Sequence, residues 1–205
     1  ISGFTQFILG IFIHSQVIKK IDPAAIHSIV VISIDRIGDA IVSLSALKAL
    51  KVLFPQAKLA VVTGKATVGL LTDLGWIDEV IPYRGFWPSV FLLRRRKFSL
   101  AVDLLMDYTL KTAWLVFLSG SRLRLGFEIA KRGRFFNLAF MPTTENKSMR
   151  ECLLDLVKFL ADSSSSDRHL SDQEFRLELS ASSASFGESF LKEKGISSQG
   201  LVFGI

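Results

Sequence analysis

The clearest hydrophobic pattern in the chain lies between Ser28 and Phe54. Ile29 to Ile32 form an uninterrupted β-branched run, and its length and composition predict a strand that is buried on both faces. From Ala40 to Phe54, apolar residues recur at helical spacing, which predicts a helix with one face turned toward a core. Residues 35–39 (DRIGD) separate the two segments. The stretch therefore predicts a strand, a tight loop and a helix in that order.

The rest of the chain alternates between the same two patterns. Further strands are expected at residues 58–63, 76–82, 100–105 and 122–126, and further helices at residues 86–93, 111–118 and 184–194. Strands that alternate with helices predict right-handed crossovers and an α/β fold, in which helices flank a mostly parallel, Rossmann-like sheet. Ligands of such open sheets bind beyond the carboxyl ends of the strands, so residues 35–39 are the first candidate site.

Composition divides the chain into four expected regions. Residues 1–22 are apolar and end near Lys19-Lys20, residues 23–162 form the α/β domain, residues 163–173 are a serine-rich linker, and residues 174–205 begin a second, truncated domain. The uninterrupted apolar run in residues 1–22 is shorter than the about 20 residues that a membrane-spanning helix needs. A helix at a membrane interface and a helix packed on the domain itself explain this segment equally well.

Positive charge is concentrated in the middle of the chain. The net charge is +6, and residues 84–134 hold eleven Lys and Arg residues against three acids, which indicates an anionic partner for that block. The cations form two groups: Arg94, Arg95, Arg96 and Lys97, between a predicted helix and a predicted strand, and Arg122, Arg124, Lys131, Arg132 and Arg134. Each group by itself is more typical of a solvated surface. Aromatic residues are not interleaved with the cations as in nucleic-acid-binding modules, so no nucleic-acid partner is expected.

Gly38 and Asp39 are the most specific feature of the candidate loop. Gly38 permits a backbone conformation or a close approach that a Cβ would prevent. Asp39 stands at or next to the first predicted helical position, where a capping carboxylate stabilises a helix by about 1 kcal/mol. Spacing alone favours a cap over a catalytic carboxylate. The loop has one glycine where a dinucleotide-binding loop has three, which argues strongly against a nicotinamide-dependent oxidoreductase.

Several motifs occur in a characteristic order. They lie in DRIGDAIVSLSALKALKVLFPQAKLAVVTG, which begins at Asp35, and in GWIDEVIPY, which begins at Gly75. This series resembles the N-terminal domain of glycosyltransferase family 9, the lipopolysaccharide heptosyltransferases. The matching elements are Gly38-Asp39, Ala46-Leu47 and FPQA at residues 54–57, whereas Ser45 stands where the family usually has proline. Similarity extends to about Leu160, which is most of the chain.

The resemblance implies the N-terminal half of a two-domain GT-B glycosyltransferase. In that family the N-terminal domain binds the sugar acceptor and the C-terminal domain binds the nucleotide-sugar donor. Transfer inverts the anomeric centre and requires no metal or other cofactor. The implied reaction moves heptose from ADP-heptose to the lipid A–Kdo acceptor of the lipopolysaccharide inner core. The chain alone is expected to be inactive, because nearly all of the donor-binding domain lies outside it.

Carried over residue by residue, the resemblance makes Asp39 the base that takes the proton of the acceptor hydroxyl. An electrostatic role, in which the carboxylate stabilises positive charge on the sugar ring, is the alternative. Acceptor binding is assigned to Arg36, Gly38, Arg94, Arg95, Arg96, Lys97 and Lys111. Guanidinium groups suit the phosphates and carboxylates of such an acceptor. A surface ion pair of Arg36 and a solvated position of Lys111 are equally consistent with the sequence.

The resemblance also implies where the protein acts. Its partners are a nucleotide-sugar donor such as ADP-heptose, an anionic lipid-linked saccharide acceptor and the surface of the inner membrane, and its location is the cytoplasmic side of that membrane. Phe86, Trp87 and Phe91 can lie at the membrane boundary, although at least one of them is expected in the core. Two other interpretations stay open: a transferase that uses another nucleotide sugar, and a non-catalytic, membrane-associated scaffold that binds saccharides with the same fold.

Overall fold

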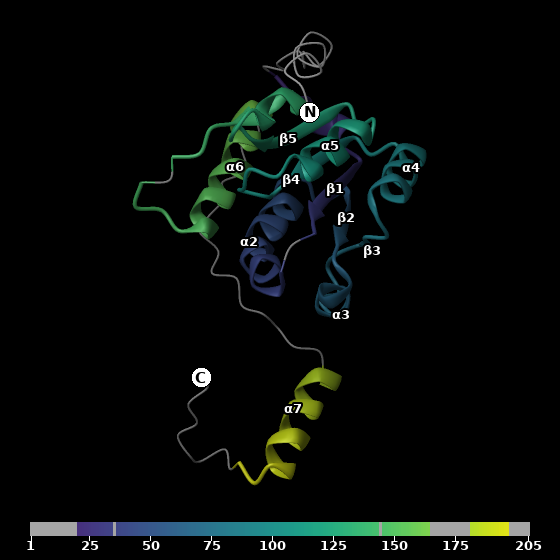
Figure 1. Cartoon of the computed structure of the whole chain (residues 1–205), viewed down its shortest axis with the longest axis vertical. Coiled ribbons are helices and arrows are strands. Elements are labelled where there is room, and N and C mark those ends of the chain that lie inside the picture. Colours follow the sequence, from purple (N-terminus) through teal and green to yellow (C-terminus); the bar gives the residue numbers. More distant parts are fainter. Residues whose placement is uncertain (1–19, 35, 144, 165–180, 197–205) are drawn as a thin grey trace, which may run out of the picture.

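A parallel β-sheet forms the centre of the computed structural model, which describes residues 20–34, 36–143, 145–164 and 181–196 (Figure 1). Within these residues the sheet has six strands in the order β3-β2-β1-β4-β5-β6, and every neighbouring pair is parallel. The strands are β1 (Ser28–Ser33), β2 (Lys58–Thr63), β3 (Glu79–Pro82), β4 (Leu100–Asp103), β5 (Leu123–Phe127) and β6 (Leu138–Phe140). This arrangement confirms the predicted α/β fold with a Rossmann-like parallel sheet.

Helices cover both faces of the sheet. The α-helices are α2 (Ile37–Leu53), α3 (Val68–Thr72), α4 (Phe86–Arg96), α5 (Leu110–Leu118), α6 (Met149–Ser163) and α7 (Ala181–Glu193). Short 3-10 helices are η1 (Pro23–Ala25), η2 (Lys65–Thr67) and η3 (Arg132–Phe135). The helices α2 and α6 pack side by side against one face, and α4 and α5 pack against the other. Three layers result, with the sheet in the middle.

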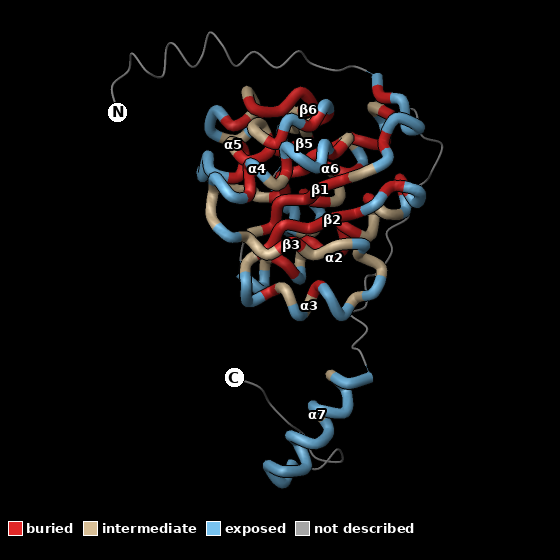
Figure 2. The backbone as a smooth tube through the Cα atoms, turned by 90° about the vertical axis from the view of Figure 1, so that its right-hand side faces the viewer, coloured by how far each residue is buried: buried red, intermediate tan, exposed pale blue. Residues whose placement is uncertain are grey.

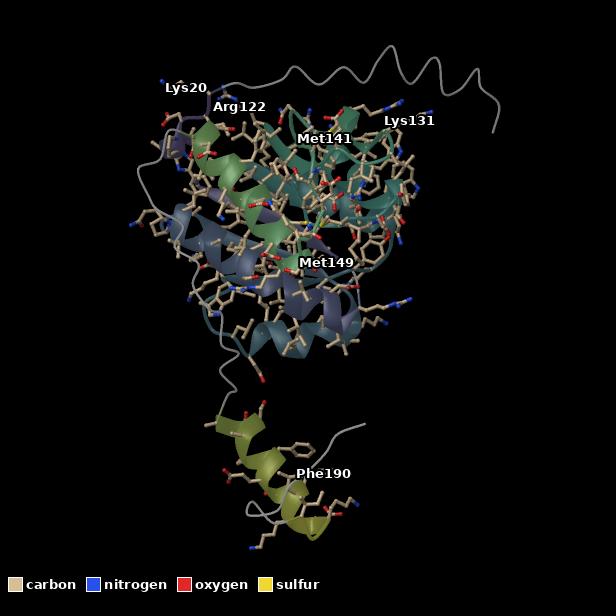
Figure 3. The ribbon with its side chains drawn as sticks, turned by 90° about the vertical axis from the view of Figure 1, so that its left-hand side faces the viewer. Lys20, Arg122, Lys131, Met141, Met149 and Phe190 are labelled. Carbon is tan, nitrogen blue, oxygen red and sulfur yellow. The ribbon has the colours of Figure 1, made fainter. Side chains whose placement is uncertain are left out.

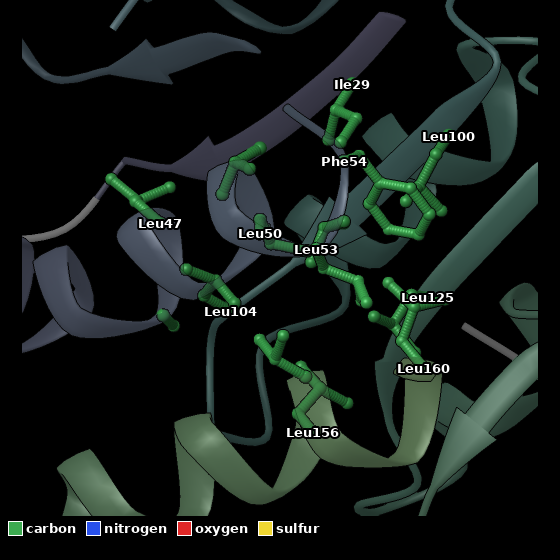
Figure 4. Packing of buried hydrophobic residues seen from close by; sticks show 14 of the residues in the cluster. Ile29, Leu47, Leu50, Leu53, Phe54, Leu100, Leu104, Leu125, Leu156 and Leu160 are labelled. Carbon is green, nitrogen blue, oxygen red and sulfur yellow. The ribbon is translucent and has the colours of Figure 1, made fainter. Parts of the chain in front are cut away.

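Side chains of β1 alternate between two hydrophobic clusters, one on each face of the sheet. Ile29 and Val31 face α2 and α6, whereas the two residues that alternate with them face α4 and α5, and all are buried. Figure 2 shows the strands as the most buried part of the chain. On the α2–α6 side, Leu50 and Leu156 belong to one cluster with residues of the strands (Figure 4). Burial on both faces explains why the run 29–32 is apolar without interruption.

Two element boundaries differ from the prediction in ways that affect the candidate site. α2 begins at Ile37, so Gly38 and Asp39 lie inside its first turn rather than in the loop before it. β4 ends at Asp103 because the backbone N–H of Leu105 donates a hydrogen bond to Asp103 Oδ1 (3.0 Å) and turns the chain away from the sheet. A local side-chain hydrogen bond therefore ends the strand two residues early.

α4 is one turn longer than predicted. Arg94, Arg95 and Arg96 form its last turn instead of a connecting segment, and basic side chains are stabilised there by the negative end of the helix dipole. Lys97 follows in the left-handed conformation (φ 51°) and ends the helix. β6 and η3 are elements that the sequence did not predict, since three or four residues are too few to show a hydrophobic period.

The regions predicted at the two ends lie mostly outside the described residues. Of the segment 1–22 only residues 20–22 are described, and there the N–H of Ile21 donates to the carbonyl oxygen of Ser163 (2.9 Å). α6 continues to Ser163, so the predicted serine-rich linker begins inside a helix, and the rest of that linker from residue 165 lies outside the description. The helix predicted at residues 184–194 corresponds to α7, which has no buried residue.

Gly126 in β5 leaves no room for a side chain, because a Cβ at this position would overlap the ring of Phe136. We expect Gly126→Ala to lower the free energy of unfolding by about 1–3 kcal/mol, the usual cost of overpacking a core. The control is Gly69→Ala in α3, where nothing lies within 4 Å of the new methyl group. Alanine stabilises a helix more than glycine does. The urea concentration at the midpoint of unfolding of this variant should therefore equal or exceed that of the wild type. Equal midpoints for both variants would contradict the prediction.

Candidate active site

The strand order reverses direction between β1 and β4. From β1 the chain crosses one face of the sheet through α2 to β2, and from β4 it crosses the other face through α5 to β5. The segments that follow β1 and β4 therefore separate at the carboxyl edge of the sheet, and open α/β sheets bind their ligands at such a switch point. Residues 36–39 and 104–111 follow β1 and β4 at this point, so the described part of the predicted loop and Lys111 lie at the same edge of the sheet.

Asp39 lies in the first turn of α2 but does not cap the helix. Arg36 occupies the N-cap position with an extended backbone (φ −69°, ψ 161°), and its side chain makes no capping hydrogen bond. Asp39 is the third helical residue and is partly buried, and its carboxylate has no hydrogen-bond or ion-pair partner among the described residues. The positive end of the helix dipole stabilises negative charge at this position. The arrangement thus presents a carboxylate without a partner among the described residues at the switch point.

Gly38 leaves the approach to this carboxylate open. It is exposed, and a Cβ built on it would meet no atom within 4 Å. Arg36, two residues earlier, is also exposed. The backbone of the first turn can therefore be reached from solvent, and its N–H groups point toward the positive end of the helix, where anions bind.

Lys111 lies on the other side of the switch point, in the first turn of α5. Its Nζ atom lies 4.7 Å from the centre of the Tyr83 ring, a cation–π contact with the residue that follows β3. The contact therefore joins the segment that follows β3 to the start of α5, which follows β4, at the carboxyl edge of the sheet. Lys111 is exposed and has no ion pair with a described residue. Its ammonium group is available to an anion.

A buried ion pair fixes the loop that leads to α5 and Lys111. Arg132 and Asp103 have no exposed side-chain surface, and Nη2 of Arg132 lies 2.6 Å from Asp103 Oδ2. The guanidinium group also donates to the carbonyl oxygens of Leu105 (2.6 Å) and Asp107 (2.7 Å) and to Oγ1 of Thr112 (3.2 Å). One arginine from η3 therefore holds the end of β4, the following loop and the first turn of α5 in a single arrangement.

Burial and local backbone strain both act against this ion pair. Burial raises the pKa of the Asp103 carboxyl above its ordinary value, while the charge of Arg132 and the N–H of Leu105 act in the opposite direction. Nε of Arg132 has no hydrogen-bond partner among the described residues. Ala130 and Lys131, which precede the arginine, both adopt positive φ angles (46° and 69°), a conformation that costs about 1–2 kcal/mol for a residue with a Cβ. The pair must offset this local strain.

Sequence patterns placed Arg132 in a surface group of cations, and this was wrong. The five members of that group are scattered. Arg132 is internal, and Arg124 is half-buried and donates a hydrogen bond from Nε to the carbonyl oxygen of Phe135 (3.0 Å). Arg122 and Lys131 lie on opposite sides of the α/β domain (Figure 3), and Nε of Arg134 donates to the carbonyl oxygen of Lys131. The sequence did contain one indication that a buried cation was needed. Asp103 ends an otherwise apolar strand run, and a buried acid needs a cationic or hydrogen-bonded partner.

The structure does not bring the Arg94–Lys97 run together with Asp39. These cations precede β4, whose first residue, Leu100, pairs with Ile29 at the start of β1. Asp39 follows the end of β1, and six residues of extended chain span about 20 Å. Arg36, Gly38, Asp39 and Lys111 therefore share the carboxyl edge of the sheet, whereas the run lies at the amino edge. Arg96 is also engaged in an ion pair with Glu79.

Two further properties concern only the described part of the chain. None of its helices combines the length and apolar character needed to cross a membrane. It also contains no group of three or more His, Cys, Asp and Glu side chains that is placed to hold a metal ion.

Comparisons with known proteins bear on the fold. The sequence matches no protein-family profile and no curated protein. Among solved structures, the chain superimposes on the structure of E. coli ADP-heptose lps heptosyltransferase II with a TM-score of 0.67 and 22% identity. It superimposes on the glycosyl transferase family 9 protein from Veillonella parvula DSM 2008 with a TM-score of 0.68 and 14% identity. The fold is that of the family 9 glycosyltransferases.

The coverage of these superpositions shows how much of the glycosyltransferase fold is present. The E. coli heptosyltransferase II match covers 84% of this chain and 52% of that structure, and the V. parvula match covers 91% and 53%. E. coli heptosyltransferase WaaC with ADP gives a TM-score of 0.59 at 16% identity, with 73% and 51% covered. The chain therefore spans about half the length of the heptosyltransferases it matches.

Proposed function

We propose that this chain is the acceptor-binding, N-terminal domain of an inverting family 9 glycosyltransferase. The observation that carries the proposal is the carboxylate of Asp39 in the first turn of α2, at the switch point of the sheet, where it has no partner among the described residues. The proposed reaction transfers heptose from ADP-heptose to a lipid A–Kdo acceptor on the cytoplasmic side of the inner membrane. Support for the donor comes from the two heptosyltransferase structures, of which one contains ADP and the other is named for ADP-heptose.

In this proposal Asp39 acts as a base toward the acceptor. The acceptor hydroxyl oxygen attacks the anomeric carbon of the donor from the face opposite the diphosphate, the bond from that carbon to the phosphate oxygen breaks, and ADP leaves. The hydroxyl becomes acidic as the new bond forms, so its proton passes to the Asp39 carboxylate late in the step. A charged carboxylate also stabilises positive charge on the sugar ring, which is the electrostatic alternative.

The cations at the carboxyl edge are assigned to the acceptor. Arg36 flanks the first turn of α2 and Lys111 reaches the same edge from α5, and both are exposed. Their charge suits the phosphates and carboxylates of an inner-core saccharide. We assign the donor to a second domain, of which residues 174–205 are the beginning. Arg94, Arg95, Arg96 and Lys97 are not part of this acceptor site.

The full-length protein should release ADP when it is given ADP-heptose and a lipid A–Kdo acceptor together, and should release little when either is omitted. Replacement of the donor by other nucleotide sugars, one at a time, tests for a transferase with a different donor. A scaffold would bind the acceptor and turn over none of these donors. That last result would overturn the proposed reaction while leaving acceptor binding in place.

Lys111→Gln should raise the KM for the acceptor about 10-fold with little change in kcat, since an exposed charge-assisted contact is lost while the proposed base is kept. The control is Lys65→Gln, which removes an exposed cation from the segment after β2 at the same edge. Initial rates of ADP release at varied acceptor concentration give both constants. Equal KM values for the two variants would remove Lys111 from the acceptor site.

A further inference from the structure

The loop between β4 and α5 displays an aromatic side chain to solvent. Tyr108 is 78% exposed, the largest exposed fraction among the large apolar side chains of the described residues. Its hydroxyl makes no hydrogen bond, and its ring no ring contact, with any described residue. Both faces of the ring are therefore available for contact with a ligand.

The backbone is anchored on each side of this ring. Before it, the carbonyl oxygen of Asp107 accepts a hydrogen bond from Nη1 of the buried Arg132 (2.7 Å). After it, the N–H (2.7 Å) and the hydroxyl (2.8 Å) of Thr109 both donate to the Asp107 carboxylate. An exposed loop held from the interior in this way loses little freedom when a ligand binds, so its binding surface is preorganised.

The position of the loop relates the ring to the candidate site. β1 and β4 are neighbouring strands, and such strands lie about 5 Å apart. Asp39 follows β1, Tyr108 follows β4, and Lys111 comes three residues later, so all three belong to the carboxyl edge of the sheet. The other tyrosine of the chain, Tyr83, lies at the same edge, but the Lys111 ammonium group is placed over its ring. Tyr108 has no such cover among the described residues.

We propose that Tyr108 is the platform on which a sugar ring of the acceptor stacks, and that Arg132 is a positioning residue that holds the platform through Asp107. This inference rests on the proposed function. The C–H bonds on one face of a pyranose carry partial positive charge and pack on the negative face of an aromatic ring. A tyrosine also loses little side-chain entropy on binding, because it has only two rotatable torsions. With Lys111 three residues away, the preferred ligand is a pyranose that carries a carboxylate or phosphate beside its apolar face.

The test is calorimetric titration of the full-length protein with the deacylated acceptor saccharide, without donor, so that no reaction occurs. Tyr108→Ala should weaken binding about 10-fold, because the apolar contact is lost. Tyr108→Phe should bind within about twofold of the wild type, since stacking uses the ring and not the hydroxyl. The matched control is Phe91→Ala, which removes an exposed ring (64%) from the middle of α4 and should also bind within about twofold.

A double-mutant cycle tests the positioning role of Arg132. Arg132→Lys should weaken binding about fivefold in the wild-type background, because lysine cannot hold the loop through the same set of hydrogen bonds. In the Tyr108→Ala background the same change should weaken binding less than about twofold, since the platform is already absent. A general loss of folded protein would lower binding equally in both backgrounds.

The outcomes distinguish this inference from the proposed function. Equal affinities of the wild type and Tyr108→Ala would overturn the inference and leave acceptor binding in place. Affinity of Tyr108→Phe as low as that of Tyr108→Ala would overturn stacking, because only the hydroxyl would then matter. Equal losses from Arg132→Lys in both backgrounds would overturn its positioning role. Absence of binding by the wild type would overturn the proposed function and this inference together.

Discussion

Arg132→Ala is expected to lower the free energy of unfolding by about 3–5 kcal/mol, the usual cost of leaving one partner of a buried ion pair alone. Asp103 would be left in the interior without its cation, and the carbonyl oxygens of Leu105 and Asp107 would lose their donor. The strain of the positive φ angles at Ala130 and Lys131 would then no longer be offset by the ion pair. The loss should exceed that of any other single arginine in the described chain.

Urea unfolding of Arg132→Ala, Arg132→Lys and Arg134→Ala measures this effect. Lysine keeps the charge but cannot reproduce the fork that reaches four groups at once, so Arg132→Lys should fall between wild type and alanine, and it provides a folded variant if alanine prevents folding. Nε of Arg134 donates a hydrogen bond to the carbonyl oxygen of Lys131 (3.1 Å) near the surface. Arg134→Ala should therefore lower the free energy of unfolding by less than about 0.5 kcal/mol. Similar losses for Arg132→Ala and Arg134→Ala would show that the buried pair is dispensable.

Asp39→Asn in the full-length protein should lower kcat at least about 100-fold, the lower range for loss of a general base. Asparagine keeps the size of the side chain and removes its charge and basicity, so the acceptor KM should change little. The matched control is Glu128→Gln, which removes an exposed carboxylate just after β5, and it should keep kcat within about threefold of the wild type. Nearly wild-type turnover of Asp39→Asn would place the base elsewhere.

A solvent isotope effect separates the two roles of Asp39. A base that receives a proton in the rate-limiting step slows the wild type in D₂O, whereas a carboxylate that acts only through its charge leaves the rate nearly unchanged. The asparagine variant should lose activity in either case, so the variant alone does not distinguish the roles.

Local patterns predicted the scaffold well, because the buried residues of β1 and α2 follow the regular spacing of a strand and a helix. The run 29–32 is apolar at every position since both faces of the sheet are covered, and the apolar positions of α2 recur at helical spacing toward α6. The start of α2 was missed because Arg36 is an unusual N-cap residue and makes no capping hydrogen bond. No sequence rule would place a helix start there.

The site was harder to predict, because its parts are joined only by the tertiary structure. Arg132 lies in a basic, polar segment, and its burial depends on Asp103, twenty-nine residues earlier. The position of Arg94 could have been predicted, since residues that directly precede a parallel strand lie at the amino edge, away from the ligand-binding edge. A count of cations ignores that geometry, and it grouped Arg94 and Lys111 although the fold places them at opposite edges.

Hydrogen–deuterium exchange of the full-length protein, with and without a deacylated acceptor saccharide, tests most directly whether the acceptor binds at the switch point. A deacylated acceptor has no lipid, so the measurement reports on recognition of the saccharide. The account predicts slower exchange in residues 36–40 and 107–112, on the two sides of the switch point, and unchanged exchange in residues 94–99. Protection confined to residues 94–99, with none near Asp39, would contradict it.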